Sequence, residues 1–429
     1  MTRRERLRQR LLALEPADVI VLAAGLILVI AWTFRALADS SPSDFGVTYA
    51  AGATAWQTGH PETLVGWLGT PLLAVVMLAV SRVMSVQTGA TLMTLLNTGV
   101  FAGTALTVLS VARERMPRWW WRVLVLALAS FGPVLSTVWF KQFNLFVLAA
   151  AAGAFMLIGR GRGGRAAALL GVSIALKPLA ILLPVALLIR RQTRRTGLQA
   201  LVWLVGLSLV ALAVLAWRAH SASVLNPWSA YENFSRKLDP HRYGYACFAD
   251  NFAPSATLCR LGGDRYFLLF ELTGLATAVV LALWVADALR PRRDAAWDLF
   301  AFVCALSVMV GPVAWSHYQL MLAPLFIVLL VRFAQRGAPL GVWAGYAVAF
   351  ILCSVDWQPY GTLPEFVRGL IGSGRVSNLH VFLTPGLIAT EAIAQFGQYV
   401  LLVTALLWYW RDAPATAVPP RAADASTAS

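Results

Sequence analysis

Charged residues are scarce in this sequence, and their scarcity excludes a water-soluble fold. Only 13% of its 429 residues are Asp, Glu, Lys or Arg, and 59% are hydrophobic, whereas a soluble domain carries about 25% charged residues. A net charge of +15 would suggest nucleic acid in a soluble protein. Basic residues confined to the ends of apolar runs are instead membrane-topology signals, so no nucleic-acid partner is expected.

Other features that would indicate common enzyme or pump classes are also missing. The four cysteines show no CxxC or Cys–His spacing typical of a metal site. No Walker loop occurs on a cytoplasmic segment, which argues against a nucleotide-driven pump. A hydrolase would need a nucleophile triad or a metal cluster, and neither is visible. Lysine occurs only at Lys141, Lys177 and Lys237.

Long apolar runs dominate the chain instead. A helix needs about 20 residues to cross about 30 Å of hydrocarbon. The runs predict an all-α polytopic membrane protein with about 10–12 membrane helices. The predicted spans are 18–38, 90–112, 119–139, 143–159, 198–217, 266–289, 297–312, 318–333, 340–355 and 388–410.

The arginines assign a side to each span. Cytoplasmic segments are enriched in Lys and Arg, and the arginine-rich first ten residues therefore place the N-terminus in the cytoplasm. Ala36-Leu37-Ala38 resembles a signal-peptidase site, but the apolar run before it is long for a cleaved signal, which favours a retained anchor. The later arginine clusters fall on the cytoplasmic side only if 71–85 stays at the outer surface as an interfacial or re-entrant helix. These clusters are Arg113, Arg115, Arg118 and Arg122; Arg160, Arg162 and Arg165; Arg190, Arg191, Arg194 and Arg195; Arg290, Arg292 and Arg293; and Arg332 and Arg336. The C-terminus is then cytoplasmic, with a disordered tail at 413–429.

The stretch between Arg165 and Arg190 is apolar but interrupted by Lys177-Pro178. Both arginines fall on the cytoplasmic side, so the chain must enter the membrane and return as two half-helices of about 11 residues each. A charge at the tip of such a hairpin is expensive without a partner. Lys177 is therefore a candidate functional residue.

The predicted outer segments are the first outer loop at 39–89, the large outer loop at 218–265 and a third loop at 356–387. None is long enough for an independent catalytic domain, so residues 1–412 form one membrane domain whose site lies where these loops meet the outer helix ends. Cys247 and Cys259 share the large loop, where an oxidising environment would permit a disulfide; two free thiols are the alternative.

Uncommon polar residues from four separate stretches reach this outer side. They are Asp44, Lys141-Gln142-Phe143-Asn144, Lys177-Pro178 and Trp315-Ser316-His317-Tyr318. Each has a simpler interpretation as a solvated loop residue, a snorkelling lysine or a buried histidine between helices. Together they supply one carboxylate, which suits proton removal from an attacking hydroxyl, and several cations, which suit a departing phosphate.

Several ordered stretches resemble glycosyltransferase family 87, the polyprenyl-phosphate-sugar-dependent membrane enzymes of GT-C architecture. The likeness runs over roughly residues 18–412. The matching stretches are Asp44-Phe45 with Tyr49-Ala50-Ala51 and Gly59, Pro71-Leu72-Leu73, Gln142-Phe143-Asn144, Gly161-Arg162 leading to Leu176-Lys177-Pro178, and Trp315-Ser316-His317-Tyr318 with Pro324. The family's Gly-Gln-x-Asn pattern begins here with Lys141, and its aromatic-Pro-Pro motif is reduced to Gly69-Thr70-Pro71.

The resemblance implies roles for individual residues. Asp44 is expected to be the general base, and Lys177 and His317 are expected to contact the donor phosphate, with Lys141 as a third cation. Further substrate contacts are expected from Gln142, Asn144, Tyr49, Trp315 and Tyr318, and from Arg236, Lys237, Arg242 and Arg260 in the large outer loop.

The sequence therefore predicts a GT-C glycosyltransferase of the cytoplasmic membrane, acting on its outer face by an inverting mechanism. Its partners would be membrane lipids, a polyprenyl-phosphate-linked sugar and a glycolipid or polysaccharide acceptor. No cofactor or metal is expected, because the lipid-phosphate sugar is itself a substrate. Mannose is the first choice of sugar and arabinofuranose the second. A lipid or sugar transporter or flippase, or a noncatalytic relative, is the alternative; a transporter is disfavoured by the lack of inverted repeats and by the one-sided polar groups.

Overall fold

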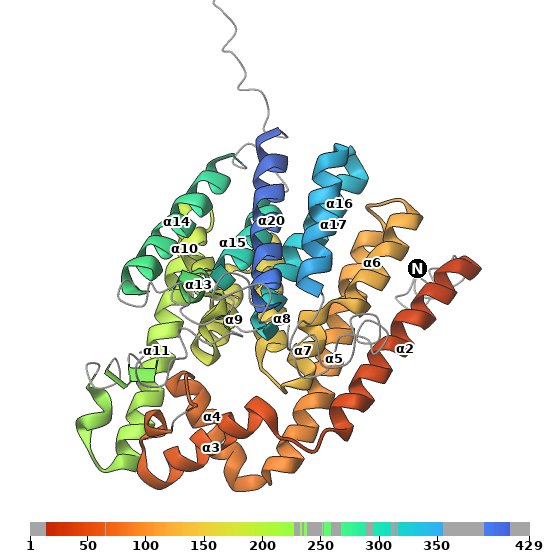
Figure 1. Cartoon of the computed structure of the whole chain (residues 1–429). Helices are drawn as coiled ribbons and strands as arrows, with labels where there is room; N and C mark the ends of the chain where they lie inside the picture. The colour runs from red at the N-terminus through yellow and green to blue at the C-terminus, as the bar shows by residue number, and fades with distance from the viewer. Residues whose placement is uncertain are drawn as a thin grey trace, which may run out of the picture.

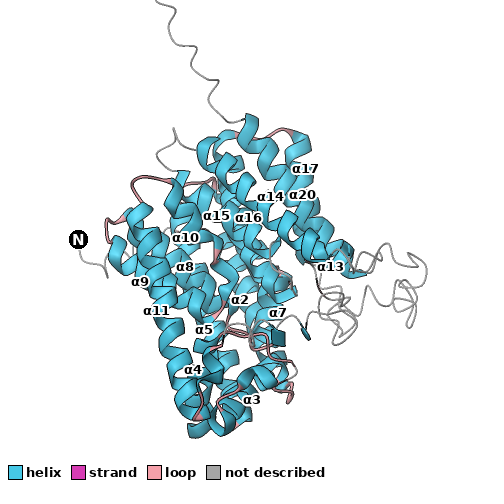
Figure 2. Cartoon of the chain, turned by 90° about the vertical axis from the view of Figure 1, so that its left-hand side faces the viewer, coloured by secondary structure: helices cyan, strands magenta, loops and turns pink. Residues whose placement is uncertain are grey.

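The structure is a computed structural model that describes most of the chain. The described residues are 14–64, 66–226, 232–233, 236–237, 251, 253–258, 267–288, 295–309, 314, 316–354 and 390–411. All regular secondary structure in these residues is helical (Figure 2). The predicted all-α fold is therefore confirmed. The tail at 413–429, the third outer loop at 356–387 and the N-terminal arginines lie outside the described residues.

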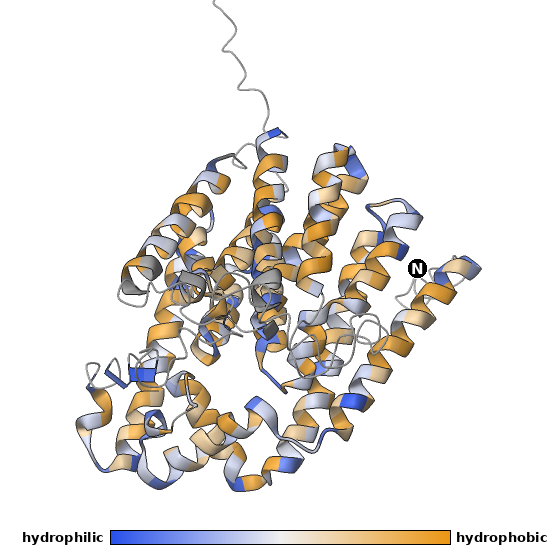
Figure 3. Cartoon of the chain, viewed as in Figure 1, coloured by the Kyte–Doolittle hydropathy of each residue, from blue (hydrophilic) through white to orange (hydrophobic). Residues whose placement is uncertain are grey.

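Five helical segments of the described chain are long and apolar enough to cross a membrane. They are Pro16–Ala38 (α2), Val86–Arg113 (α5), Arg118–Trp139, Arg194–Ala219 (α11) and His317–Arg336. Other apolar helices accompany them: Asn144–Gly159 (α8), Gly163–Leu176 (α9), Leu182–Ile189 (α10), Phe267–Ala288 (α14), Ala295–Met309 (α15), Leu340–Ser354 (α17) and Thr390–Arg411 (α20), with the five-residue Pro254–Leu258 (α13) between α11 and α14. Figure 3 shows hydrophobic residues along most of the length of these helices. The chain is a polytopic membrane protein.

One predicted span is divided in the structure. The run 119–139 is expected as a single helix, but Arg118–Ser130 (α6) ends before Phe131, and Gly132–Trp139 (α7) begins after it. Pro133 explains the break, because a proline has no amide hydrogen to donate and is accommodated only in the first turn of a helix. The predicted interruption at Lys177-Pro178 is confirmed: Lys177 is extended, as the residue before a proline prefers, between α9 and the short 3-10 helix Pro178–Ala180 (η2).

The expected first outer loop is mostly helical. It contains Ser43–Thr58 (α3), Pro61–Thr63 (η1) and Pro71–Val83 (α4). The helices α3 and α4 pack side by side below one end of the bundle, and we call them the α3–α4 layer (Figure 1). At 13 residues, α4 is about 20 Å long and too short to cross about 30 Å of hydrocarbon.

Close backbone contact and a shared core fix the α3–α4 layer in place. A Cβ at Gly52 would lie 2.3 Å from the carbonyl carbon of Met77, so α3 and α4 could not approach each other with a larger residue there. Phe45 of α3 belongs to a buried cluster, and the partly buried Phe143 and Leu176 pack against it. Phe45 directly follows Asp44, Phe143 directly follows Gln142, and Leu176 directly precedes Lys177. Their packing therefore sets the register of the three polar side chains.

The opposite end of the bundle is held by ion pairs. Asp18 of α2 accepts a 2.7 Å hydrogen bond from Nε of Arg122 on α6 and is 1% exposed. Asp298 of α15 is buried and pairs with Arg332 of Ala323–Arg336 (α16) through two bonds, of 3.1 and 2.5 Å. Both arginines belong to the clusters that indicate the membrane topology in the sequence, and each also connects two helices.

Candidate functional site

Four predicted site residues from four different elements lie together beside the α3–α4 layer. Asp44 is in the first turn of α3, and Gln142 is in the turn between α7 and α8. Lys177 joins α9 to η2, and His317 is in the 3-10 helix Ser316–Leu322 (η7). Residues 44 and 317 are distant in sequence, so only the folded chain brings these groups together.

A hydrogen-bonded row connects the carboxylate to the lysine. The Gln142 Nε2 donates to Asp44 Oδ2 at 2.6 Å, and Lys177 Nζ donates to Gln142 Oε1 at 2.6 Å. This pair of contacts fixes the orientation of the Gln142 amide, because its nitrogen can only donate and its oxygen can only accept. The ammonium of Lys177 also lies 4.5 Å from the centre of the Tyr318 ring, a cation–π contact.

Asp44 retains a free side that could receive a substrate. Its side chain is 34% exposed, and its Oδ1 accepts no hydrogen bond within the described chain. Burial raises the pKa of Asp44 above its ordinary value, while the Gln142 hydrogen bond and the Lys177 charge lower it. The result is a carboxylate of increased basicity with an unoccupied oxygen, as a general base requires.

Two hydrogen bonds hold the backbone of His317 in place. Its carbonyl accepts hydrogen bonds from Asn144 Nδ2 at 2.7 Å and from Thr137 Oγ1 at 3.3 Å. The imidazole Nε2 lies 3.8 Å from Asp44 Oδ2, and the centre of the Phe140 ring lies 5.6 Å from the centre of the imidazole ring. Asn144, a predicted substrate-binding residue, is buried and holds η7 in place.

Lys141, predicted to bind the donor phosphate, is directed elsewhere. Its Nζ donates to the carbonyl of Ser41 at 2.8 Å and to that of Trp139 at 3.4 Å. The residue is 2% exposed and has a left-handed φ of 56°. It therefore connects the α7–α8 turn to the chain just before α3. In its present conformation its ammonium holds the segment that carries Asp44.

Three other predicted residues bind protein groups away from the cluster. Tyr49 donates its hydroxyl to the carbonyls of Met84 at 2.9 Å and Ser81 at 3.3 Å. Buried Lys237 donates to the carbonyls of Trp67 at 2.6 Å and Glu62 at 2.8 Å, and exposed Arg236 pairs with Glu232. The remaining predicted residues lie outside the described ones: Trp315, Arg242, Arg260, Cys247 and Cys259.

Thr70 is a positioning residue that the sequence reasoning missed. Its Oγ1 accepts from Leu73 N at 3.2 Å, which caps α4, and donates to the Leu176 carbonyl at 3.0 Å. A threonine before Pro71 is a recognisable helix start, so the cap could be predicted, but the bond to α9 could not. Through this bond α4 holds the residue next to Lys177.

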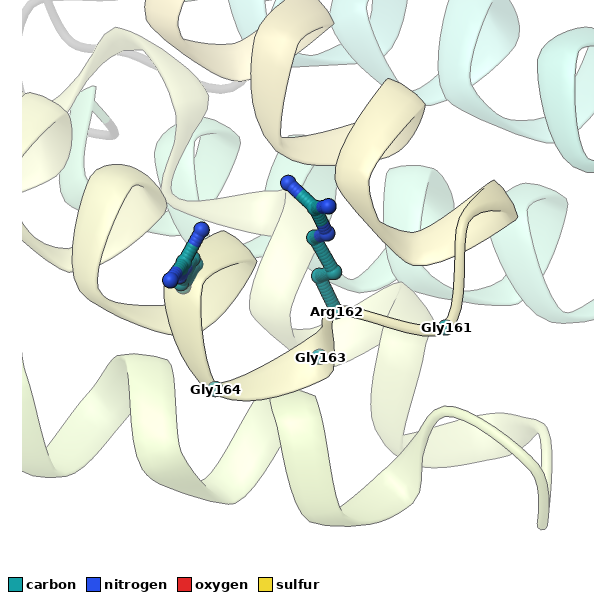
Figure 4. A pocket seen from close by; sticks show the side chains of 5 residues that line it. Gly161, Arg162, Gly163 and Gly164 are labelled. Atoms are coloured by element: carbon teal, nitrogen blue, oxygen red, sulfur yellow. The ribbon is translucent and has the colours of Figure 1, made fainter.

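A separate hollow lies at the other end of α9 (Figure 4). It is lined by Gly161, Arg162, Gly163, Gly164 and Arg165. Lys177 lies beyond the last residue of α9, about 20 Å along the helix axis, so this hollow is distinct from the Asp44 cluster. In the part of the chain that the structure describes, no three His, Cys, Asp or Glu side chains are placed to hold a metal ion.

Comparison with known proteins identifies the family. A polyprenol-phosphate-mannose-dependent alpha-(1-2)-phosphatidylinositol mannoside mannosyltransferase of Mycobacterium tuberculosis is 25% identical over 356 residues, which cover 74% of this chain and 76% of that protein. The protein of the same name from Mycolicibacterium smegmatis is 32% identical over 207 residues, or 46% and 43% of the two chains. No solved structure matches. The model of glycosyltransferase family 87 matches residues 67–312, more than half of the chain, and the chain therefore belongs to this family of glycosyltransferases.

Proposed function

We propose that the protein transfers a mannosyl residue from a polyprenyl phosphate to a hydroxyl group of a cell-envelope glycolipid or polysaccharide. The names of the two mycobacterial relatives support mannose and the lipid-phosphate donor, and favour mannose over arabinofuranose. The reaction would take place at the outer face of the cytoplasmic membrane. The observation that carries the proposal is the Asp44–Gln142–Lys177 row, which places a base near a cation.

In the proposed reaction, the acceptor hydroxyl gives its proton to Oδ1 of Asp44. The acceptor oxygen forms a bond to the anomeric carbon of the donor sugar as the bond from that carbon to the phosphate oxygen breaks. The electron pair of the broken bond leaves with the polyprenyl phosphate. A single carboxylate is sufficient for such a displacement with inversion, because no covalent enzyme intermediate forms.

Lys177 is the group proposed to stabilise the departing phosphate. An ammonium has three N–H donors, and Gln142 accepts from one of them, which leaves others for phosphate oxygens. Fixed positive charge aimed at developing negative charge is an effective form of catalysis. Nε2 of His317 lies 3.8 Å from Oδ2 of Asp44, and His317 is proposed as a second contact for the phosphate of the sugar donor.

Gln142 is proposed to keep the base and the cation apart. A direct pair between Asp44 and Lys177 would reduce the basicity of the carboxylate and occupy the ammonium. The amide between them donates a hydrogen bond to Asp44 and accepts one from Lys177, which leaves Asp44 Oδ1 open to the acceptor. Gln142 thus serves both reacting groups without taking part in bond making.

The test compares Asp44→Asn with wild type in proteoliposomes supplied with polyprenyl-phospho-mannose or polyprenyl-phospho-arabinofuranose. We expect mannosyl transfer by wild type and a loss of roughly 10²- to 10⁴-fold in the variant, the usual contribution of a general base. Glu62→Gln is the matched control, because Glu62 lies in the same outer segment and binds His60 at 2.6 Å. Transfer of neither sugar by wild type, or unimpaired transfer by Asp44→Asn, would refute the proposal.

A further inference from the structure

A second cationic group lies at the far end of α3, away from Asp44. The indole ring of Trp56, in the last turns of α3, is flanked by two arginines. The guanidinium carbon of Arg82, from the last turn of α4, lies 4.5 Å from the ring centre, and that of Arg218, from the last turn of α11, lies 4.0 Å from it. Three helices thus contribute to one aromatic and basic cluster, which we call the Trp56 cluster.

The positive charges of this cluster are not neutralised by the described chain. Neither arginine pairs with a carboxylate among the described residues. The acidic residue nearest in sequence to Arg82, Glu62, is paired with His60, and the one nearest to Arg218, Glu232, is paired with Arg236. Both guanidinium carbons lie close to one ring centre, so they are no more than about 8.5 Å apart and repel each other. A bound anion would remove this repulsion.

Both arginines also have hydrogen-bond donors to spare. Arg218 donates from Nε and Nη2 to the carbonyl of Trp56, at 3.1 and 2.5 Å, and its Nη1 makes no hydrogen bond in the described chain. Arg82 is exposed, and its guanidinium lies over the ring and makes no hydrogen bond or ion pair with the described residues. A guanidinium carries five N–H donors in a planar fork that matches the oxygens of a phosphate.

The location of the cluster corresponds to the headgroup level of a membrane. Along α11, 23 residues separate Arg195 from Arg218, which is about 34 Å of helix and slightly more than the hydrocarbon thickness of about 30 Å. Large apolar side chains beside the arginines face outward: Val83 is 76% exposed and Trp217 is 68% exposed. Tryptophan is typical of the membrane interface.

From these observations we propose that Arg82 and Arg218 bind the phosphate of an anionic membrane lipid at the end of the bundle that carries the α3–α4 layer. The lipid phosphate would accept hydrogen bonds from both guanidinium groups beside the Trp56 ring. Its acyl chains would lie along the exposed apolar side chains of α4 and α11. Since Trp56 and Asp44 are on the same helix, the bound lipid would also hold α3 against α11.

The test measures thermal unfolding of the full-length protein in nanodiscs of phosphatidylcholine with increasing fractions of phosphatidylglycerol. We expect wild type to be stabilised in a saturable manner. In Arg82→Gln, half-saturation should require about fivefold more phosphatidylglycerol, the usual contribution of one basic side chain to attraction for an anionic lipid. Arg82→Lys keeps the charge and should show a smaller change.

Two controls make the test specific. Arg35→Gln removes one charge from an exposed arginine that lies 5.5 Å from the ring centre of Trp32, at the end of α2 near the same layer, and should leave the half-saturating fraction unchanged. Inorganic phosphate, added to nanodiscs of phosphatidylcholine alone, should not stabilise the protein. The proposal is overturned if phosphatidylglycerol gives no saturable effect, if Arg35→Gln shifts it as much as Arg82→Gln, or if inorganic phosphate stabilises the protein in an Arg82-dependent way.

Discussion

Substitution of Lys141 by methionine tests whether this residue positions the base or binds the donor. Methionine keeps the length of the buried side chain and removes the ammonium, so the bonds to the carbonyls of Ser41 and Trp139 are lost. A hydrogen bond from a charged group contributes about 1.5–3 kcal/mol. If all of this free energy serves to hold the segment before α3 in place, its loss should lower kcat roughly 10- to 150-fold.

The assay is steady-state mannosyl transfer with the concentration of the polyprenyl-phosphate donor varied. A positioning role predicts a lower kcat at nearly constant donor KM, because the variant changes the placement of Asp44 and leaves the donor contacts intact. Lys141→Arg keeps a charged donor at the end of the side chain and should restore part of the rate. A large increase in donor KM with kcat unchanged would contradict this reasoning and support direct phosphate binding by Lys141.

Two further predictions concern pH and stability. Burial raises the pKa of Asp44, and a general base acts only when deprotonated. The acidic limb of the pH–rate profile should therefore lie above the ordinary aspartate pKa of about 3.9. Gln142→Leu removes an interaction that lowers this pKa, so the limb should move to still higher pH, and an unmoved limb would exclude Asp44 as the titrating group. Asp298→Asn removes the buried carboxylate that accepts two hydrogen bonds from Arg332. Breaking a buried ion pair from one side should cost about 3–5 kcal/mol and lower the unfolding temperature in detergent. An Asp298→Leu and Arg332→Met double variant should recover most of this loss, and equal losses in both would contradict this assignment.

The sequence predicted the membrane class and the break at Lys177 because both depend on local composition. Runs of apolar residues and a proline after a lysine are recognisable without knowledge of the partners. The division of 119–139 was missed because Pro133 is tolerated in the first turn of a helix, so its presence alone does not distinguish a break from a continuous span. The sidedness of the helices remains a prediction.

The site could be predicted as a set of residues but not as an arrangement. Asp44, Gln142, Lys177 and His317 were selected for their polarity and for a family resemblance, and the structure places them together. The targets of Lys141 and Tyr49 are backbone carbonyls, which every sequence has, so no residue pattern could reveal them. The φ of 56° at Lys141 gives the reason why glycine suits this position in the resembling family, since glycine adopts left-handed backbone freely.

The division of the site between the α3–α4 layer and the bundle also affects its biogenesis. Asp44 leaves the ribosome before Gln142 and Lys177, and His317 follows it after about 270 residues, or roughly 14–55 s of synthesis. The proposed base therefore lacks its amide partner for the first 98 residues of this interval and its neighbouring cation for the first 133. The proposed catalytic site therefore forms only when most of the chain has been inserted into the membrane, and a truncated translation product that ends before residue 177 would lack it.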